Sequence, residues 1–163
     1  MKATEIHMPF GIAITDCGSE LSSELRLFLV KPGPKFDVFG ELATHALESL
    51  LLALVAEGVD LRGRGASKAR LVAAGQCAHT LVRMRGGAKP PRAELSALSS
   101  ELRHLLVDPN RRFDVLGELA VHVLDSLLYT LAAEGVDVSG PGARAAIGTA
   151  AQSVGQWMAS YDD

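Results

Sequence analysis

The chain has 163 residues, of which 48% are hydrophobic but only 5% aromatic, with 21% charged residues and a net charge of −3. This length suits one domain or two small ones, and the charged fraction is ordinary for a globular protein, which argues against extensive disorder. The core must consist of leucine, valine and alanine, a composition that favours closely packed helices and excludes the aromatic and β-branched enrichment of an all-β protein.

The N-terminal residues do not form a secretory signal, because Pro9 and Gly11 interrupt their apolar stretch. The longest strongly apolar run, Leu50–Ala56, lies between two glutamates and is far shorter than the ~20 residues of a membrane span. Cys17 and Cys77 show no metal-ligand spacing, and we expect reduced thiols. These features predict a soluble cytoplasmic protein that does not bind a membrane.

The dominant feature of the sequence is an internal duplication. Leu21–Asp60 aligns without a gap to Leu98–Asp137, 77 residues later, and 27 of 40 positions are identical. The period exceeds the roughly 20–50 residues of most solenoid repeats, so the repeated unit is a small group of helices.

Each unit is predicted to contain three helices. The first covers about residues 19–30 and is stopped by Pro32. The second, about residues 38–57, is apolar nearly all round in its second half and ends before Gly58. A glycine-rich turn then leads to a third helix over about residues 66–84.

The chain therefore divides into four parts. Residues 1–18 have no counterpart in the duplication and are expected to form a short extended arm, and 19–84 form the first repeat. Residues 85–92, RGGAKPPR, are predicted to be a basic linker with nothing to pack. Residues 93–163 form the second repeat, whose third helix, about 143–160, has diverged almost completely.

These elements predict an all-α fold. Three helices bury little surface alone, so the two units are expected to share one core. Homologous halves commonly pack about a pseudo-two-fold axis, as the identical subunits of a dimer do. We therefore predict one pseudo-two-fold helical bundle with the two long apolar helices at its central contact.

One candidate site is a polar stripe on the long helix. Asp37, Glu41, His45 and Ser49 are spaced by four residues, Glu48 lies beside them, and the second copy repeats the pattern. If the two stripes faced each other, their carboxylates and imidazoles would suit iron, manganese or zinc. The alternative is a solvated helix face. The predicted metal ligands are Glu41, His45, Glu48, Glu118, His122 and Asp125.

A second candidate is a basic stretch between the long helix and the second repeat. No acidic residue occurs from Leu61 to Ala93, yet this stretch holds eight of the 16 basic residues. It could bind an acidic protein surface or phosphates, but no aromatic residues are interleaved for base stacking. The predicted patch comprises Arg62, Arg64, Lys68, Arg70, Arg83, Arg85, Lys89 and Arg92.

No enzyme signature is present: the glycine-rich turns match neither a Walker loop nor a dinucleotide fingerprint, and no Gly-x-Ser-x-Gly elbow occurs. We therefore expect a non-catalytic helical interaction or regulatory module that binds a protein partner or self-associates. The first alternative is a metal-binding bundle that uses the duplicated stripes. The second, less favoured, is nucleic-acid or polyanion binding through residues 62–92.

Overall fold

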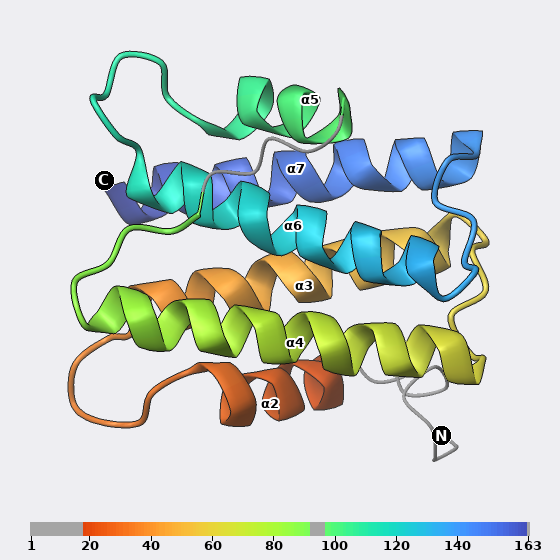
Figure 1. The fold of residues 1–163 in the computed structure, drawn as a ribbon, viewed down its shortest axis with the longest axis horizontal. Helices are drawn as coiled ribbons and strands as arrows, with labels where there is room; N and C mark the ends of the chain where they lie inside the picture. Colours follow the sequence, from red (N-terminus) through yellow and green to blue (C-terminus); the bar gives the residue numbers. More distant parts are fainter. Residues whose placement is uncertain (1–17, 92–96, 163) are drawn as a thin grey trace.

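A computed structural model describes residues 18–91 and 97–162 of the chain. Within these ranges the fold is all-α (Figure 1). The predicted helix bounds are correct to within two residues. Arg92 and the predicted arm, apart from Gly18, lie outside the described residues. The helices are α2 (Gly18–Leu29), α3 (Val38–Ala56), α4 (Arg64–Arg85), α5 (Ala97–Leu106), α6 (Val115–Ala133) and α7 (Pro141–Asp162).

The two long apolar helices begin and end by the same local chemistry. The Asp37 side chain caps α3 by accepting a hydrogen bond from the amide of Gly40, and Asp114 caps α6 in the same way. After each helix the chain reverses at a glycine with positive φ, 86° at Gly58 and 87° at Gly135. The bounds of α3 and α6 therefore follow directly from residues that the duplication repeats.

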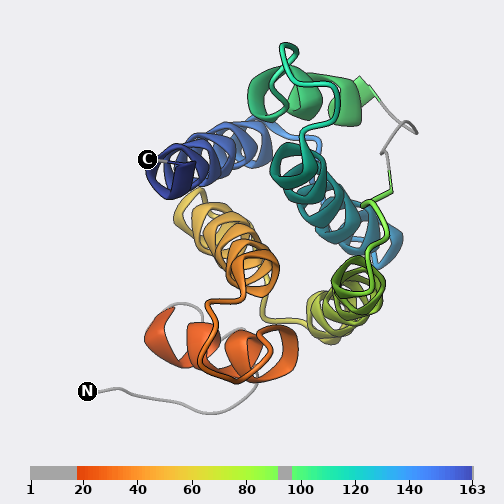
Figure 2. The same ribbon diagram turned by 90° about the vertical axis from the view of Figure 1, so that its left-hand side faces the viewer.

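The four longest helices form the centre of the molecule. Figure 2, which looks nearly along the helices, shows α3, α4, α6 and α7 around a common interior, with α2 and α5 on opposite outer sides. The helix α3 packs against α6, as expected for the central contact, but its most extensive partner is α7. In the same way α4 packs mainly on α6 and only slightly on α3. The third helix of each repeat therefore packs on the long helix of the other repeat.

The core consists of leucine and small residues, as the composition predicted. Leu42, Leu50 and Leu54 of α3 are fully buried, as are Leu119 and Leu127 of α6. The third helices contribute four buried alanines each, which allow their backbones to approach the long helices closely. Although α4 and α7 differ in most side chains, the buried positions of both are small or apolar apart from Arg70, so both helices can pack closely on the long helices.

The central position of α3 and α6 also explains their composition. Each is long and apolar enough to cross a membrane by length and composition alone. Of the most apolar part of each helix, 50% in α3 and 61% in α6 is buried within the bundle, and central helices of bundles share this composition.

The segment predicted as an unpacked linker makes specific contacts, which corrects that prediction. Arg85 is the last residue of α4, and its guanidinium donates a hydrogen bond of 2.7 Å to the carbonyl of Leu29. The Lys89 ammonium lies 4.8 Å from the centroid of the Phe113 ring, and Pro90 is buried. These contacts join the segment to residues distant in the sequence, which its content of glycines, prolines and charges does not show.

Candidate functional site

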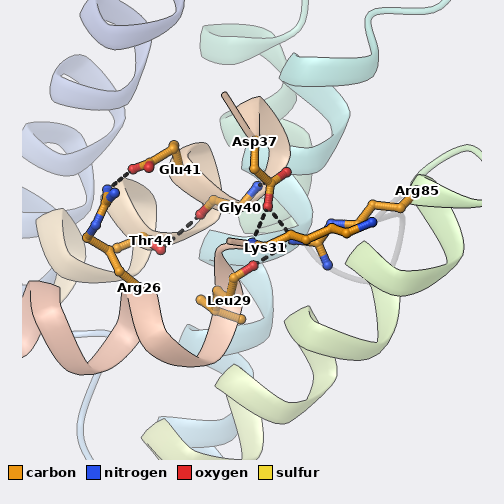
Figure 3. Close-up of polar contacts among 8 residues, drawn as sticks. All are labelled: Arg26, Leu29, Lys31, Asp37, Gly40, Glu41, Thr44 and Arg85. Carbon is orange, nitrogen blue, oxygen red and sulfur yellow. Dashed lines mark hydrogen bonds and ion pairs between the residues drawn. The ribbon is translucent and has the colours of Figure 1, made fainter. Parts of the chain in front are cut away.

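Two glutamates of the predicted stripes form ion pairs with arginines of the neighbouring short helices. Glu41 of α3 forms an ion pair with Arg26 of α2 (Figure 3), and Glu118 of α6 forms one with Arg103 of α5. Glu118 is almost completely buried, at 1% exposure. These carboxylates tie α2 and α5 to the long helices.

Asp37, at the start of the stripe, connects three segments of the chain. Its carboxylate accepts hydrogen bonds from the amides of Lys31, at 2.7 Å, and Gly40, at 3.3 Å, and pairs with Arg85 of α4 (Figure 3). Burial alone would raise the pKa of Asp37, but these hydrogen bonds outweigh it and leave that pKa below its usual value. Asp37 therefore has a structural role.

His45 occupies a contact between α3 and α7. Its Nε2 atom lies 3.1 Å from the Oγ of Ser153 and 3.4 Å from the Oγ of Ser49. Its ring is stacked on Trp157, with a centroid separation of 6.3 Å. Burial lowers the pKa of His45, partly offset by the Ser153 carbonyl, and therefore favours the neutral imidazole.

His122, the counterpart of His45, contacts the other third helix. Its Nε2 atom lies 3.0 Å from the Oγ1 of Thr80 in α4. Burial lowers the pKa of His122, and the nearby Asp125 partly opposes this effect. Burial likewise raises the pKa of Glu48 on α3. The two histidines thus lie at two separate helix contacts, one with α7 and one with α4.

The two stripes do not assemble into a ligand set. Within the described ranges, no three His, Cys, Asp or Glu side chains lie close enough to hold a metal ion. Glu41 and Glu118 pair with arginines, while the histidines contact serine and threonine hydroxyls. The geometry therefore gives the metal-binding alternative no support.

The predicted basic patch is divided rather than continuous. Arg62 pairs with Asp60 at 3.2 Å, and Lys68 lies 3.5 Å from Glu134. Lys68 and Arg83 are 15 residues apart on α4, so these two members of the patch lie about 22 Å apart along the helix at 1.5 Å per residue. Arg64 and Arg83 are exposed, Arg70 is buried, and Arg85 pairs with Asp37.

The buried arginine marks the most distinctive cavity. A pocket of about 180 Å³ opens between α2, α3 and α4 and reaches α6. It is named here the α2–α4 pocket. Its lining is apolar except for the Glu24 carboxylate and the Arg70 guanidinium, and Arg70 is only 5% exposed. The lining residues are Glu24, Leu25, Phe28, Leu47, Leu51, Arg70, Leu71, Ala74 and Leu127.

The second repeat provides an internal comparison for this pocket. Six of its nine lining residues, including the glutamate and the alanine, are identical to the residues 77 positions away in the other repeat. The other three are Phe28, Arg70 and Leu71, which correspond to Leu105, Ile147 and Gly148. The distinctive chemistry of the α2–α4 pocket therefore comes from three residues, one of them charged.

Large apolar side chains are exposed on α2 and α4, and two of them, Phe28 and Leu71, also line the pocket. Leu27 is 87% exposed and Phe28 58% on α2, while Leu71 is 63% and Val82 65% exposed on α4. Leu71 and Val82 are three helical turns apart, so they lie on the same side of α4. Together with Val72, which is 41% exposed, these five residues are named here the α2–α4 face.

Sequence reasoning found Arg70 only as one member of a charged stretch, and it did not identify Phe28 or Leu71. The available signal was the comparison of α4 with α7, in which an arginine corresponds to an isoleucine and a leucine to a glycine.

Comparison of the chain with protein-family models, with curated proteins and with solved structures found no match.

Proposed function

We propose that the chain is a non-catalytic interaction module built by duplication, in which two three-helix units form one pseudo-two-fold bundle. The matching bounds support this arrangement: α6 and α7 begin and end 77 residues after α3 and α4. Reciprocal packing supports it too, since Gly65 of α4 lies against Glu134 after α6, and Gly142 of α7 against Glu57 after α3.

The α2–α4 face is the surface we assign to the partner. The observation that carries the proposal is the difference between the two repeats at its five positions. Exposed apolar residues of the first repeat correspond mostly to small or polar residues of the second. In the order of the chain, the counterparts of Leu27, Phe28, Leu71, Val72 and Val82 are His104, Leu105, Gly148, Thr149 and Ala159. Exposed apolar patches of this kind are typical of protein-binding surfaces.

The charge around this face defines the partner. Arg64, Lys68 and Arg83 are exposed on α4, and the sequence from Leu61 to Ala93 contains no acidic residue. A complementary surface therefore combines an apolar stripe with flanking carboxylates. The α2–α4 face is built from two helices side by side, so the occupant we propose is an acidic amphipathic helix of a partner protein.

The proposal is tested by giving the first repeat the residues of the second. The chain and its Leu71→Gly/Val72→Thr/Val82→Ala variant are each immobilised, and proteins from native cells retained by the chain alone are identified. The contacting segment is then synthesised, and its Kd is measured by isothermal titration calorimetry. We expect an acidic amphipathic helix whose Kd rises at least tenfold in the variant and with increasing salt.

The matched control is Leu105→Ala, which removes an exposed leucine of the second repeat at the position of Phe28. We expect it to change the Kd less than twofold. Equal binding of the segment to the triple variant would contradict the proposal, as would capture of the chain's own second copy as the only ligand.

A further inference from the structure

We propose that the α2–α4 pocket binds a small monocarboxylic acid, with the carboxylate on the Arg70 guanidinium and an apolar body among the leucines. This inference goes beyond the proposed protein interaction and does not rest on it. It follows from the position of one buried charge in an apolar cavity, from the size of that cavity, and from the comparison between the repeats.

The Arg70 guanidinium is a buried positive charge that lines an otherwise mostly apolar pocket. Arg70 is 5% exposed, and it donates a hydrogen bond to the Oγ of Ser67 at 3.2 Å. Burial lowers the pKa of Arg70 to about 10, so the group remains charged at neutral pH. A guanidinium has five donors in a planar fork that matches a carboxylate, and an apolar environment strengthens such a pair.

The second repeat shows that packing does not require this charge. The equivalent position holds Ile147, which is also buried, while Leu25, Leu47 and Leu51 all recur as leucines. A buried arginine is usually less favourable than an apolar residue of similar volume. A buried charge at a position where the second repeat has isoleucine indicates a role in binding.

The dimensions of the pocket define the body of the ligand. Its volume of about 180 Å³ is close to that of a cavity of ~150 Å³ known to bind benzene. Leu47 and Leu51 of α3 and Leu127 of α6 line it, so the group that enters must be apolar. A carboxylate attached to one aromatic ring, or to about five aliphatic carbons, satisfies both requirements.

Glu24 gives the site a second, opposing charge. This exposed residue of α2 lines the same pocket and interacts electrostatically with Arg70, raising the pKa of the arginine against the effect of burial. An incoming carboxylate competes with Glu24 for the guanidinium. Removing that charge should therefore tighten the binding of an acid and leave the binding of a neutral analogue unchanged.

The experiment titrates the full chain, carrying isotope-labelled leucine and valine methyl groups, with benzoate, hexanoate, benzyl alcohol and hexylamine. We expect both acids to shift the methyl resonances of Leu25, Leu47, Leu51 and Leu71 in the NMR spectrum. Their Kd should be at least tenfold lower than that of the alcohol or the amine. Arg70→Ile should remove this preference, Arg70→Lys should restore part of it, and Glu24→Gln should lower the Kd of the acids.

Equal Kd values for benzoate and benzyl alcohol would overturn the proposal, and so would binding of the acids that Arg70→Ile leaves unchanged. Shifts confined to other leucines would place the acid elsewhere and would also overturn it. If the free acids fail to bind but a partner helix loses affinity in Arg70→Ile, the guanidinium recognises an acidic side chain. The small-acid proposal then fails while the proposed interaction stands.

Discussion

Arg70 and Ile147 occupy equivalent positions on α4 and α7, and both are buried. Their difference places a positive charge in one repeat and an apolar side chain in the other. Most leucines and alanines around the two positions are the same. The comparison of Arg70 with Ile147 therefore distinguishes the side chains that packing requires from the charge that only the first repeat contains. Sequence reasoning placed Arg70 in a basic patch because sequence does not show which members of a charged stretch are buried.

The first prediction concerns the stability of Arg70→Ile. We expect the free energy of unfolding to rise by about 1 kcal/mol or more, because desolvation of the guanidinium is removed and the isoleucine of the second repeat already packs there. Urea denaturation followed by circular dichroism measures the change. A loss of stability would show that Arg70 is a structural residue, which would remove the argument that its charge serves binding.

The second prediction concerns the two half-buried histidines, His45 and His122. The pKa of His45 and of His122 is lower in the folded chain than the ordinary value of 6.5. As the pH falls below about 6.5, the unfolded chain binds protons that the folded chain does not, so stability is lost. We expect the free energy of unfolding to decrease from pH 7 to 5.5, and to decrease less in a His45→Gln/His122→Gln variant. An identical pH dependence in the variant would contradict this assignment.

At the scale of the helices, prediction from sequence succeeded where local chemistry decides. The bounds of α3 and α6 follow from an aspartate cap and a glycine, both visible in the sequence. The packing of α4 on α6 and of α7 on α3 was not predicted. The spacing of apolar residues shows which face of a helix is buried, but not which other helix packs against that face. The packed linker was missed for a related reason, since contacts of Arg85 and Lys89 depend on tertiary structure.

Two glycines test this packing at the start of the third helices. A Cβ added at Gly65 would lie 2.9 Å from the Glu134 carbonyl oxygen, and one at Gly142 would lie 3.0 Å from that of Glu57. We expect Gly65→Ala to lower the free energy of unfolding by about 1–2 kcal/mol, and Gly142→Ala to lower it less. Thermal denaturation of both variants measures these changes.

The controls are Gly75→Ala and Gly148→Ala, within the same two helices. A Cβ at either position meets nothing within 4 Å, and alanine is the better helix former, so both variants should gain up to about 1 kcal/mol. If Gly65→Ala gained stability as its controls do, the close approach of α4 to the end of α6 would be wrong.

At the scale of the whole molecule, the third helix of each repeat packs on the long helix of the other repeat. This arrangement predicts that neither repeat folds as a monomer. A fragment of residues 1–91 lacks α6, the main partner of α4, and a fragment of residues 92–163 lacks α3, the main partner of α7. We expect each fragment to show low helicity at low concentration, and an equimolar mixture to gain helicity as the fragments associate. Circular dichroism with analytical ultracentrifugation tests this, and a fully helical monomeric fragment would contradict it.

The two repeats differ in the side chains that they expose. The second repeat has small or polar side chains where the first exposes leucine and valine on α4, while the buried positions of α4 and α7 are small or apolar apart from Arg70. We propose that the two repeats share one core and that only the first carries a binding surface. The central claim is therefore a functional difference between equivalent positions.

Site-specific photocrosslinking tests that claim most directly. A photoreactive residue is placed in one variant at Val82 and in another at its counterpart Ala159, which is also exposed. Both chains are irradiated with extracts of native cells, and the crosslinked peptides are sequenced. The account predicts crosslinks from position 82 to an acidic amphipathic segment of another protein, and none to that segment from position 159. Equal crosslinking from both positions, or crosslinks only between copies of this chain, would contradict it.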